Sequence, residues 1–265
     1  MAKKPVYNNE SITSLKGADR VRRRPAVIFG SDGLEGCEHS IFEIVSNSID
    51  EAREGYGKKI VVTRYNDDSV EVEDFGRGIP VDYNNAENRY NWELVFCEMY
   101  AGGKYKNDED GSYEYSLGLN GLGLCATQYA SLYMDAEVYS AGAHYTLHFE
   151  KGENVGGLHK EPYNGKKTGT RIRWKPDLDV FTDIHVPETY YLDMLRRQAV
   201  VNDGVTFLFR SEKETGGFTE TQFYYDNGIR DHALELAGEN PLSTVQFWQT
   251  EKKVRDRDDK PEYKC

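Results

Sequence analysis

The chain has 265 residues, enough for one large or two modest domains with a buried core. A hydrophobic content of 38% with 29% charged residues is typical of a soluble globular protein. There is no apolar run of about 18 residues and no N-terminal apolar h-region, which predicts a cytoplasmic protein without a membrane span or secretory signal. The net charge of −12 argues against a broad grip on nucleic acid, because phosphate neutralisation needs a patch of Lys and Arg.

The N-terminal stretch is predicted to be an arm followed by a short helix. Residues 1–15 are polar, with Tyr7 and Ile12 as lone apolar anchors, which is typical of an end that becomes ordered on a neighbour. A helix over residues 17–23 is expected to stop at Pro25. A basic cluster lies in and around this helix, and we expect it to be solvated or paired with nearby acids. Its members are Lys16, Arg20, Arg22, Arg23 and Arg24.

The stretch from Glu38 to Ala52 predicts an amphipathic helix. His39, Glu43 and Asn47 recur every four residues, so they share one polar stripe. The opposite face has the spacing of a helix packed on a sheet, with Ile41, Ile44, Val45, Ser48 and Ala52. An acid on the polar stripe can polarise a water, and an amide oxygen can bind Mg²⁺. A solvated polar face is the alternative interpretation.

A β-hairpin is predicted next, because residues 59–65 and 69–74 alternate apolar and polar side chains about a turn at 66–68. The second strand leads into D-F-G-R-G-I-P at residues 74–80. A carboxylate at a strand end followed by two glycines lets a flat ligand approach the backbone, while the carboxylate accepts a hydrogen bond from an exocyclic amine. Taken alone, D-x-G-x-G is a weak signal.

A glycine-rich stretch follows a predicted helix at residues 91–100. A-G-G-K-Y at 101–105 precedes S-L-G-L-N-G-L-G-L at 116–124, which opens a helix from about Cys125 to Leu132. Such a loop directs free backbone N–H groups toward phosphate oxygens, and Lys104 adds a point charge. The order G-x-x-G-x-G, the lack of a strand immediately before it and the lack of G-K-[ST] disfavour the Rossmann and Walker loops.

From Met134 onward the pattern predicts an antiparallel sheet with one wet face, since apolar residues alternate along segments at 144–152 and 168–177. A helix over 187–200 is expected after them. The remaining predicted elements are strands at 204–210 and 219–225, a short helix at 231–237 and a strand at 244–250.

Five motifs occur in one order along the chain: E-x-x-x-N-S-I-D-E-A, D-F-G-R-G-I-P, A-G-G-K-Y, G-L-N-G-L-G and T-G-T-x-I-x-W-x-P-D. Together they resemble the ATPase domain of the bacterial DNA gyrase B subunit and its topoisomerase IV counterpart, in the GHKL superfamily. The opening L-K-G-A-D-R-V-R-R-R-P is also similar to that family's version. The resemblance implies an α/β two-layer sandwich of the Bergerat type, with helices on one face of a mixed, mostly antiparallel sheet.

The resemblance also implies roles for individual residues. Glu43 matches the general base that activates the water attacking the γ-phosphate, His39 matches the residue that supports it, and Asn47 matches the Mg²⁺ ligand. Asp74 matches the acid that accepts the adenine amine. The other positions assigned to the nucleotide are Glu51, Gly76, Arg77, Gly78, Ile79, Pro80 and Thr170 around the base and rim, Lys104, Gly118, Leu119, Asn120, Gly121, Leu122, Gly123 and Leu124 in the phosphate lid, and Tyr7 and Ile12 in an arm that reaches the partner's nucleotide.

ATP and Mg²⁺ are the implied cofactors, and a homodimer formed on ATP binding is the implied assembly. In the family, ATP binding and hydrolysis drive DNA strand passage, with a gyrase A-type subunit and DNA bound through regions absent here. The expected division is an arm at 1–15, the ATP-binding domain at 16–220 and the beginning of a transducer domain at 221–265. In the family, the transducer domain sends a lysine back to the γ-phosphate. Residues from about 221 are expected to be only the beginning of that domain, without this lysine, so we expect this chain to bind ATP and Mg²⁺ but to turn over slowly and dimerise poorly.

Several positions depart from the family pattern. Ser46 stands where gyrases usually have Asp, Asn120 replaces the usual His, and P-A-V-I-F-G stands for P-G-M-Y-I-G. Ser140 falls where many members carry an Arg at the mouth of the pocket. Because aminocoumarin inhibitors use that Arg in the family, weakened aminocoumarin binding is expected.

Alternative interpretations share some of these signals. Sensor histidine kinases, MutL repair proteins and the ninety-kilodalton heat-shock chaperone have related motifs. The kinases need a phospho-accepting helical hairpin ahead of the domain, and the other two lack the R-x-R-P opening and the A-G-G-K-Y lid. A topoisomerase IV subunit and a non-catalytic module that dimerises on nucleotide binding remain alternatives to a gyrase-type ATPase.

Overall fold

The computed structural model describes residues 11, 14–101, 117, 121–239, 242–248, 250, 252–254 and 263–264. Six of the predicted site residues lie outside these ranges: Tyr7, Ile12, Lys104, Gly118, Leu119 and Asn120.

The fold is built on an eight-stranded sheet with the order β10-β9-β1-β2-β8-β5-β6-β7. β1 pairs in parallel with β9, and the other neighbours pair antiparallel. The strands are β1 (Lys59–Arg64), β2 (Val70–Asp74), β5 (Ser131–Ser140), β6 (Ala143–Glu150), β7 (Glu153–Pro162), β8 (Gly169–Pro176), β9 (Thr206–Glu212) and β10 (Phe218–Phe223). The predicted mixed, mostly antiparallel sheet is confirmed.

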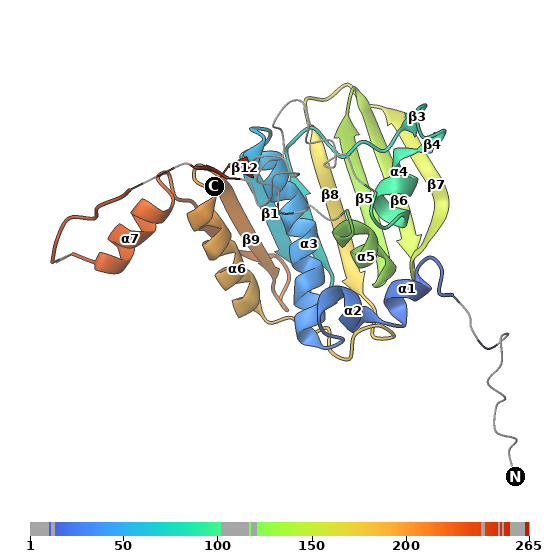
Figure 1. Ribbon diagram of the computed structural model, residues 1–265, viewed down its shortest axis with the longest axis horizontal. Helices are drawn as coiled ribbons and strands as arrows, with labels where there is room; N and C mark the ends of the chain where they lie inside the picture. Colours follow the sequence, from blue (N-terminus) through green and yellow to red (C-terminus); the bar gives the residue numbers. More distant parts are fainter. Residues whose placement is uncertain are drawn as a thin grey trace, which may run out of the picture.

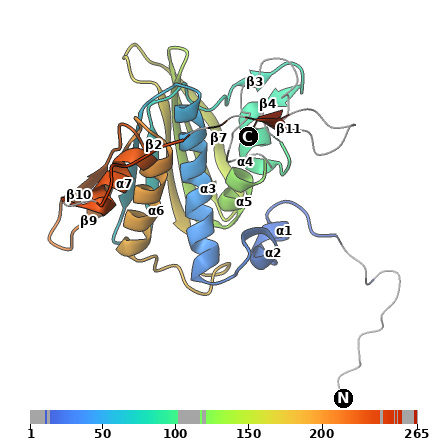
Figure 2. The ribbon, with the colours of Figure 1, turned by 60° about the vertical axis from the view of Figure 1, so that its left-hand side comes forward.

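Helices form a second layer on one face of this sheet. Figures 1 and 2 show α3 (Leu34–Arg53), α5 (Gly123–Tyr129) and α6 (Glu188–Val201) in front of the strands, with α3 near the middle. The short α1 (Asp19–Arg22) and α2 (Pro25–Phe29) lead into α3, α4 (Asn91–Cys97) packs beside α5, and α7 (Ile229–Ala237) projects from the end of the layer (Figure 1). The predicted two-layer α/β sandwich is confirmed.

The alternation of side chains along the strands explains the two faces of the sheet. Leu147 and Phe149 of β6 and Ile172 and Trp174 of β8 point into the helix layer, where each is at most 3% exposed. The opposite face carries charges in register, because Arg173 of β8 lies opposite Glu71 on β2 and opposite Asp135 on β5. A sheet with one apolar and one charged face buries only the apolar side under helices.

The helix α3 supplies the complementary apolar surface. Ile41, Ile44, Val45 and Ile49 are at most 2% exposed and belong to the continuous core beneath the helices. Burying each such side chain stabilises the fold by about 1.5–3 kcal/mol relative to an exposed one. The polar residues between them form the other face of the helix.

Three local features differ from the predictions. The helix predicted at 17–23 ends before Pro25 as expected, at Arg22, but Pro25 then begins a second helix, α2, that was not predicted, because its fixed φ suits the first position of a helix. Gly30 at φ 79° ends α2. A small hairpin of β3 (Tyr83–Asn84) and β4 (Arg89–Tyr90) was not predicted. The strand predicted at 244–250 is wrong: residues 244–248 are not in a strand, and the nearby strand is β11 (Lys253–Val254), which pairs with β12 (Tyr263–Lys264). An alternating pattern makes a strand only where a neighbouring strand is available.

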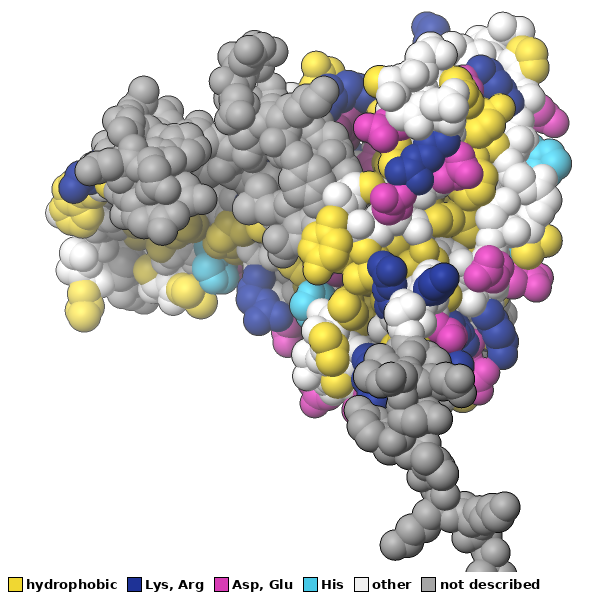
Figure 3. Space-filling model, turned by 45° about the vertical axis from the view of Figure 1, so that its right-hand side comes forward, with side chains coloured by type: hydrophobic (Ala, Val, Ile, Leu, Met, Phe, Trp, Pro, Cys, Tyr) yellow, Lys and Arg dark blue, Asp and Glu magenta, His cyan; other side chains and the backbone are white. Residues whose placement is uncertain are grey.

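The surface is consistent with the acidic composition. On the described part of the face in Figure 3, Lys and Arg side chains are interspersed with Asp and Glu rather than gathered into one basic patch. Within the described residues, no helix is both long and apolar enough to cross a membrane.

The basic cluster near the N-terminus contains one structural arginine. The Arg22 guanidinium donates to the carbonyl oxygens of Tyr129 and Ser131, each at 3.2 Å, and to Asp177 Oδ2 at 2.5 Å. The side chains of Arg22 and Asp177 are only 15% and 5% exposed. Arg23, by contrast, pairs with Asp19 at the surface, where both side chains are at least half exposed. These pairings confirm that acids neutralise part of the cluster.

We therefore expect Arg22→Ala to lower the free energy of unfolding by about 3 kcal/mol, because it leaves a buried carboxylate without its main partner. Arg23→Ala is the matched control and should cost less than about 0.5 kcal/mol. Urea denaturation measures both changes. Similar losses in the two variants would contradict the structural role of Arg22.

Candidate functional site

The polar stripe predicted for α3 is present. His39 Nε2 lies 3.0 Å from Glu43 Oε1, and the two side chains are 45% and 26% exposed. The hydrogen bond to Glu43 raises the pKa of His39, against a smaller opposing effect of burial. The Glu43 carboxylate is therefore oriented by an imidazole one helical turn away and keeps its second oxygen for another partner.

Asn47 continues the stripe by one turn. Its amide nitrogen donates to the carbonyl oxygen of Glu43 at 3.0 Å, and Ser46 Oγ donates to the same carbonyl at 3.0 Å. Because the nitrogen of the amide is used in this way, the side-chain oxygen of Asn47 is the atom left to meet a cation. Amide and carboxylate oxygens are the ligands that Mg²⁺ prefers, so Asn47 fits a role as a metal ligand. Within the described residues, no group of three or more His, Cys, Asp and Glu side chains forms a metal site by itself.

The glycine-rich stretch meets α3 at two points. A Cβ atom on Gly123, the first residue of α5, would lie only 1.8 Å from Glu43 Oε2, so a side chain there would displace the carboxylate. The backbone N–H of Leu117 donates to the buried Asp50 Oδ1 at 2.7 Å. The predicted phosphate-binding stretch and the predicted base are thus brought together by the fold.

Asp74 lies at the end of β2 and is only 7% exposed. Its Oδ1 accepts the backbone N–H groups of Gly76 at 3.0 Å and Thr170 at 3.1 Å, and its Oδ2 accepts the Ser48 hydroxyl at 3.1 Å. Burial raises the pKa of Asp74 to about 6, while these three hydrogen bonds act in the opposite direction. A buried carboxylate held by three donors has little freedom to reorient.

The rim beside Asp74 is an ion pair. Arg77 Nε and Nη2 donate to the two carboxylate oxygens of Glu51 at 2.9 and 3.0 Å, and the Arg77 backbone N–H donates to Oε1 at 2.7 Å. The guanidinium also lies over the Tyr56 ring, 3.9 Å from its centroid. A Cβ atom on Gly76 would come within 2.2 Å of Glu51 Cγ, which explains the glycine. The predicted pairing of Glu51 with Arg77 is observed in the structure.

Thr170 connects the turn after Asp74 to β8. Its Oγ1 accepts the backbone N–H of Ile79 at 3.0 Å, while its own N–H donates to Asp74. Gly78 has φ 84°, and a Cβ atom there would lie 2.9 Å from Val138 Cγ1 and 3.2 Å from Ser140 Cβ. The turn therefore lies against the end of β5, and Ser140 is at its edge.

The other predicted residues have plainer surroundings. Pro80 is exposed and follows Ile79, and the carbonyl oxygen of Gly121 accepts the Tyr100 N–H at 2.9 Å. Leu122 is the residue before α5, and Leu124 is buried within it. Gly121, Leu122 and Leu124 therefore connect the C-terminal end of the glycine-rich stretch to Tyr100 and α5.

Two residues at the site were missed by sequence reasoning. Ser48 belongs to the apolar face of α3, where it is buried but donates to Asp74. Gly169 has φ 123°, and a Cβ atom there would lie 2.1 Å from the carbonyl oxygen of Asp74. The signal for Ser48 was a polar residue within an apolar stripe, and for Gly169 it was the glycine of T-G-T.

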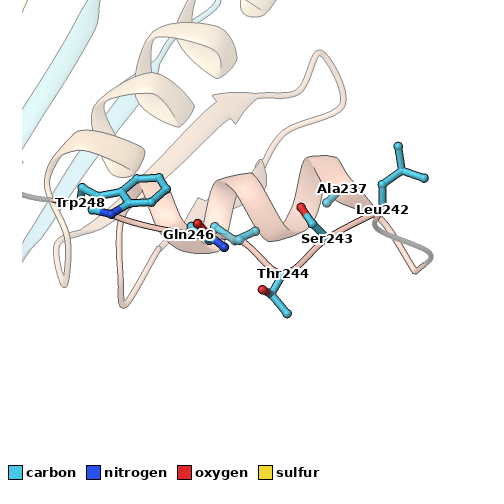
Figure 4. A pocket seen from close by; sticks show the side chains of 7 residues that line it. Ala237, Leu242, Ser243, Thr244, Gln246 and Trp248 are labelled. Carbon is cyan, nitrogen blue, oxygen red and sulfur yellow. The ribbon is translucent and has the colours of Figure 1, made fainter.

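A separate open hollow of about 580 Å³ lies beside α7 (Figure 4). It is lined by Ala237, Leu242, Ser243, Thr244, Val245, Gln246 and Trp248. None of these belongs to the arrangement around α3 and Asp74, so the hollow does not contribute to the site described here.

The sheet, its single helix layer and the site between α3 and the β2 turn define a two-layer sandwich of the Bergerat type. Comparison with known proteins agrees. The DNA gyrase B subunit of Treponema denticola is 38% identical over 227 residues, which is 85% of this chain and 35% of that protein. The DNA gyrase B subunit of Thermotoga maritima is 36% identical over 257 residues, 97% of this chain and 39% of that protein.

The solved structures lead to the same family. The 43K ATPase domain of Thermus thermophilus gyrase B, determined with an aminocoumarin, matches with a TM-score of 0.72 and 29% identity over 94% of this chain and 62% of that one. No family model matches the chain. The chain is thus similar over most of its length to DNA gyrase B subunits, and its fold matches that of the gyrase B ATPase domain. It spans between a third and two fifths of the length of the two gyrase proteins from Treponema and Thermotoga.

The buried carboxylate of Asp74 is expected to lower the stability of the fold when it is ionised, although the predicted site needs it as a hydrogen-bond acceptor. Because its pKa is raised from 3.8 to about 6, the folded protein binds this proton more tightly than the unfolded chain; stability therefore falls as the pH rises from about 4 to about 6, and the full cost of the ionised form persists at higher pH. Asp74→Asn should therefore raise the free energy of unfolding at pH 8 by about 1–3 kcal/mol, with no gain at pH 4.

Thermal denaturation at the two pH values measures this effect. Asp82→Asn is the control, because a hydrogen bond from Lys160 lowers the pKa of Asp82 and that acid should not destabilise the fold when ionised. An Asp74→Asn variant that is less stable than the parent at pH 8 would refute the interpretation.

Proposed function

We propose that this chain binds ATP with Mg²⁺ and hydrolyses it, as part of a type IIA topoisomerase of the gyrase B type. The proposal depends on one observation: the hydrogen bond from Ser48 to Asp74 joins the helix carrying Glu43 and Asn47 to the strand end carrying a buried acceptor. A base, a cation ligand and an acceptor for an amine thus border one site. The similarity of the chain to DNA gyrase B subunits and to the gyrase B ATPase domain supports this assignment.

Glu43 is proposed to act as the general base. Its carboxylate accepts a proton from the attacking water, and His39 keeps that carboxylate oriented through the 3.0 Å contact. Hydrolysis of a phosphoanhydride depends on positioning and charge neutralisation, so one well-placed carboxylate is sufficient for the proton transfer. Asn47 would hold Mg²⁺, which supplies neutralisation of the phosphate charge when bound.

Asp74 is proposed to recognise the base by accepting the adenine amine on Oδ2. Thr170 and Gly78 border the same space, the Glu51–Arg77 pair forms its rim and Pro80 covers it. Gly76 and Ile79 shape the turn. Lys104 and the stretch from Gly118 to Leu124 are proposed to surround the phosphates. Gly123 supports this role, because its backbone approaches the Glu43 carboxylate closely.

The role of the whole protein is proposed from the family. We propose that it dimerises on ATP binding through the arm with Tyr7 and Ile12. It would act in DNA strand passage together with a gyrase A-type partner, in the cytoplasm. The division into 1–15, 16–220 and 221–265 is also a proposal, and β10 spans its second boundary. A topoisomerase IV subunit is the nearest alternative.

Glu43→Ala separates an ATPase from a nucleotide-switched module that does not hydrolyse. We expect hydrolysis to fall at least about 100-fold, because the general base is lost, while ATP affinity changes little. Phosphate release and calorimetry measure the two quantities. Glu35→Ala, at the exposed start of α3, is the control. Unchanged hydrolysis in Glu43→Ala would contradict the catalytic role.

Ser140 predicts weak binding of aminocoumarins, because it replaces the Arg that the family uses. The proximity of Ser140 to Gly78 supports a position at the mouth of the proposed pocket. Ser140→Arg should increase aminocoumarin affinity about tenfold by adding a charged hydrogen-bond donor, whereas ATP affinity should stay within about twofold. Calorimetry that shows very tight aminocoumarin binding by the parent chain would count against this prediction.

A further inference from the structure

We propose that Ser48 is a positioning residue for selection of the base, whose hydroxyl holds Asp74 Oδ2 where it accepts the exocyclic amine. This inference rests on the proposed ATP site and adds a determinant on the buried face of α3. It concerns the choice between purines that carry a 6-amino group and purines that do not.

The geometry distinguishes the two oxygens of Asp74. Oδ1 is occupied by the backbone N–H groups of Gly76 and Thr170. Oδ2 accepts the Ser48 hydroxyl at 3.1 Å. A carboxylate oxygen can accept more than one hydrogen bond, so Oδ2 retains capacity for a further donor. Ser48 therefore determines the direction in which that remaining capacity points.

The protonation state of Asp74 also depends on the Ser48 hydroxyl. Burial disfavours the ionised form of Asp74, and the nearby Glu51 on α3 adds repulsion, although Glu51 is itself paired with Arg77 from the turn. The hydrogen bonds from Gly76, Thr170 and Ser48 oppose these effects. Without Ser48, Asp74 is protonated at a higher pH, and a protonated oxygen donates instead of accepting.

The chain provides a matched control on the same helix. Ser40 is also fully buried, but its hydroxyl donates to the carbonyl oxygen of Gly36 at 2.9 Å, within α3 itself. Ser40→Ala removes the same atom from the same kind of environment without touching Asp74. Differences between the two variants therefore report on the contact with Asp74.

The test compares ATP with purine riboside 5′-triphosphate, which lacks the 6-amino group. Calorimetry is performed on the parent chain, Ser48→Ala and Ser40→Ala at pH 6.5 and pH 8.5. Ser48→Ala should weaken ATP binding about five- to tenfold but weaken binding of the analogue less than twofold, because the analogue makes no contact that depends on Oδ2. The loss for ATP should be larger at pH 6.5, and Ser40→Ala should change neither nucleotide.

The outcomes separate this inference from the proposed function. If the parent chain prefers ATP but Ser48→Ala loses both nucleotides equally, or loses neither, Ser48 is only structural and the inference is overturned. If the parent chain binds both nucleotides equally well, or neither, the proposed role of Asp74 is overturned and this inference with it.

Discussion

The burial of one carboxylate constrains the site more than any other interaction. Asp74 is removed from water at the end of β2, and an ionised group there is tolerated only because three donors converge on it. The donors come from the turn after β2, from β8 and from α3. Satisfying this carboxylate therefore also fixes how these three parts of the fold meet.

The helix α3 combines core packing on one face with the residues of the proposed site on the other. One side is inserted into the core, and the other presents His39, Glu43 and Asn47 in consecutive turns. A rigid helix on a packed sheet holds such groups more precisely than a loop would. Close approach of the glycine at the start of α5 then brings a second element to the Glu43 carboxylate.

Two of the departures from the family pattern, Ser46 and Ser140, fall at described positions where the structure accommodates them. Ser46 is buried and satisfies its hydroxyl on the carbonyl of Glu43, so this position requires no charged partner in this chain. Ser140 lies at the edge of the β2 turn, and the hydrogen bonds that hold Asp74 come from Ser48, Gly76 and Thr170 instead.

The sequence by itself determined the local features: the polar and apolar faces of the 38–52 helix, the hairpin before Asp74, the alternation in the later strands and the family motifs. Each depends on spacing within one element, where residue order dictates which side chains share a face. Only the tertiary structure decided that Ser48 donates to Asp74, that Gly123 meets Glu43 and that Arg22 rather than Arg23 is the buried arginine. Those contacts join residues far apart in the chain, and their partners are selected by the packing of the helix layer on the sheet.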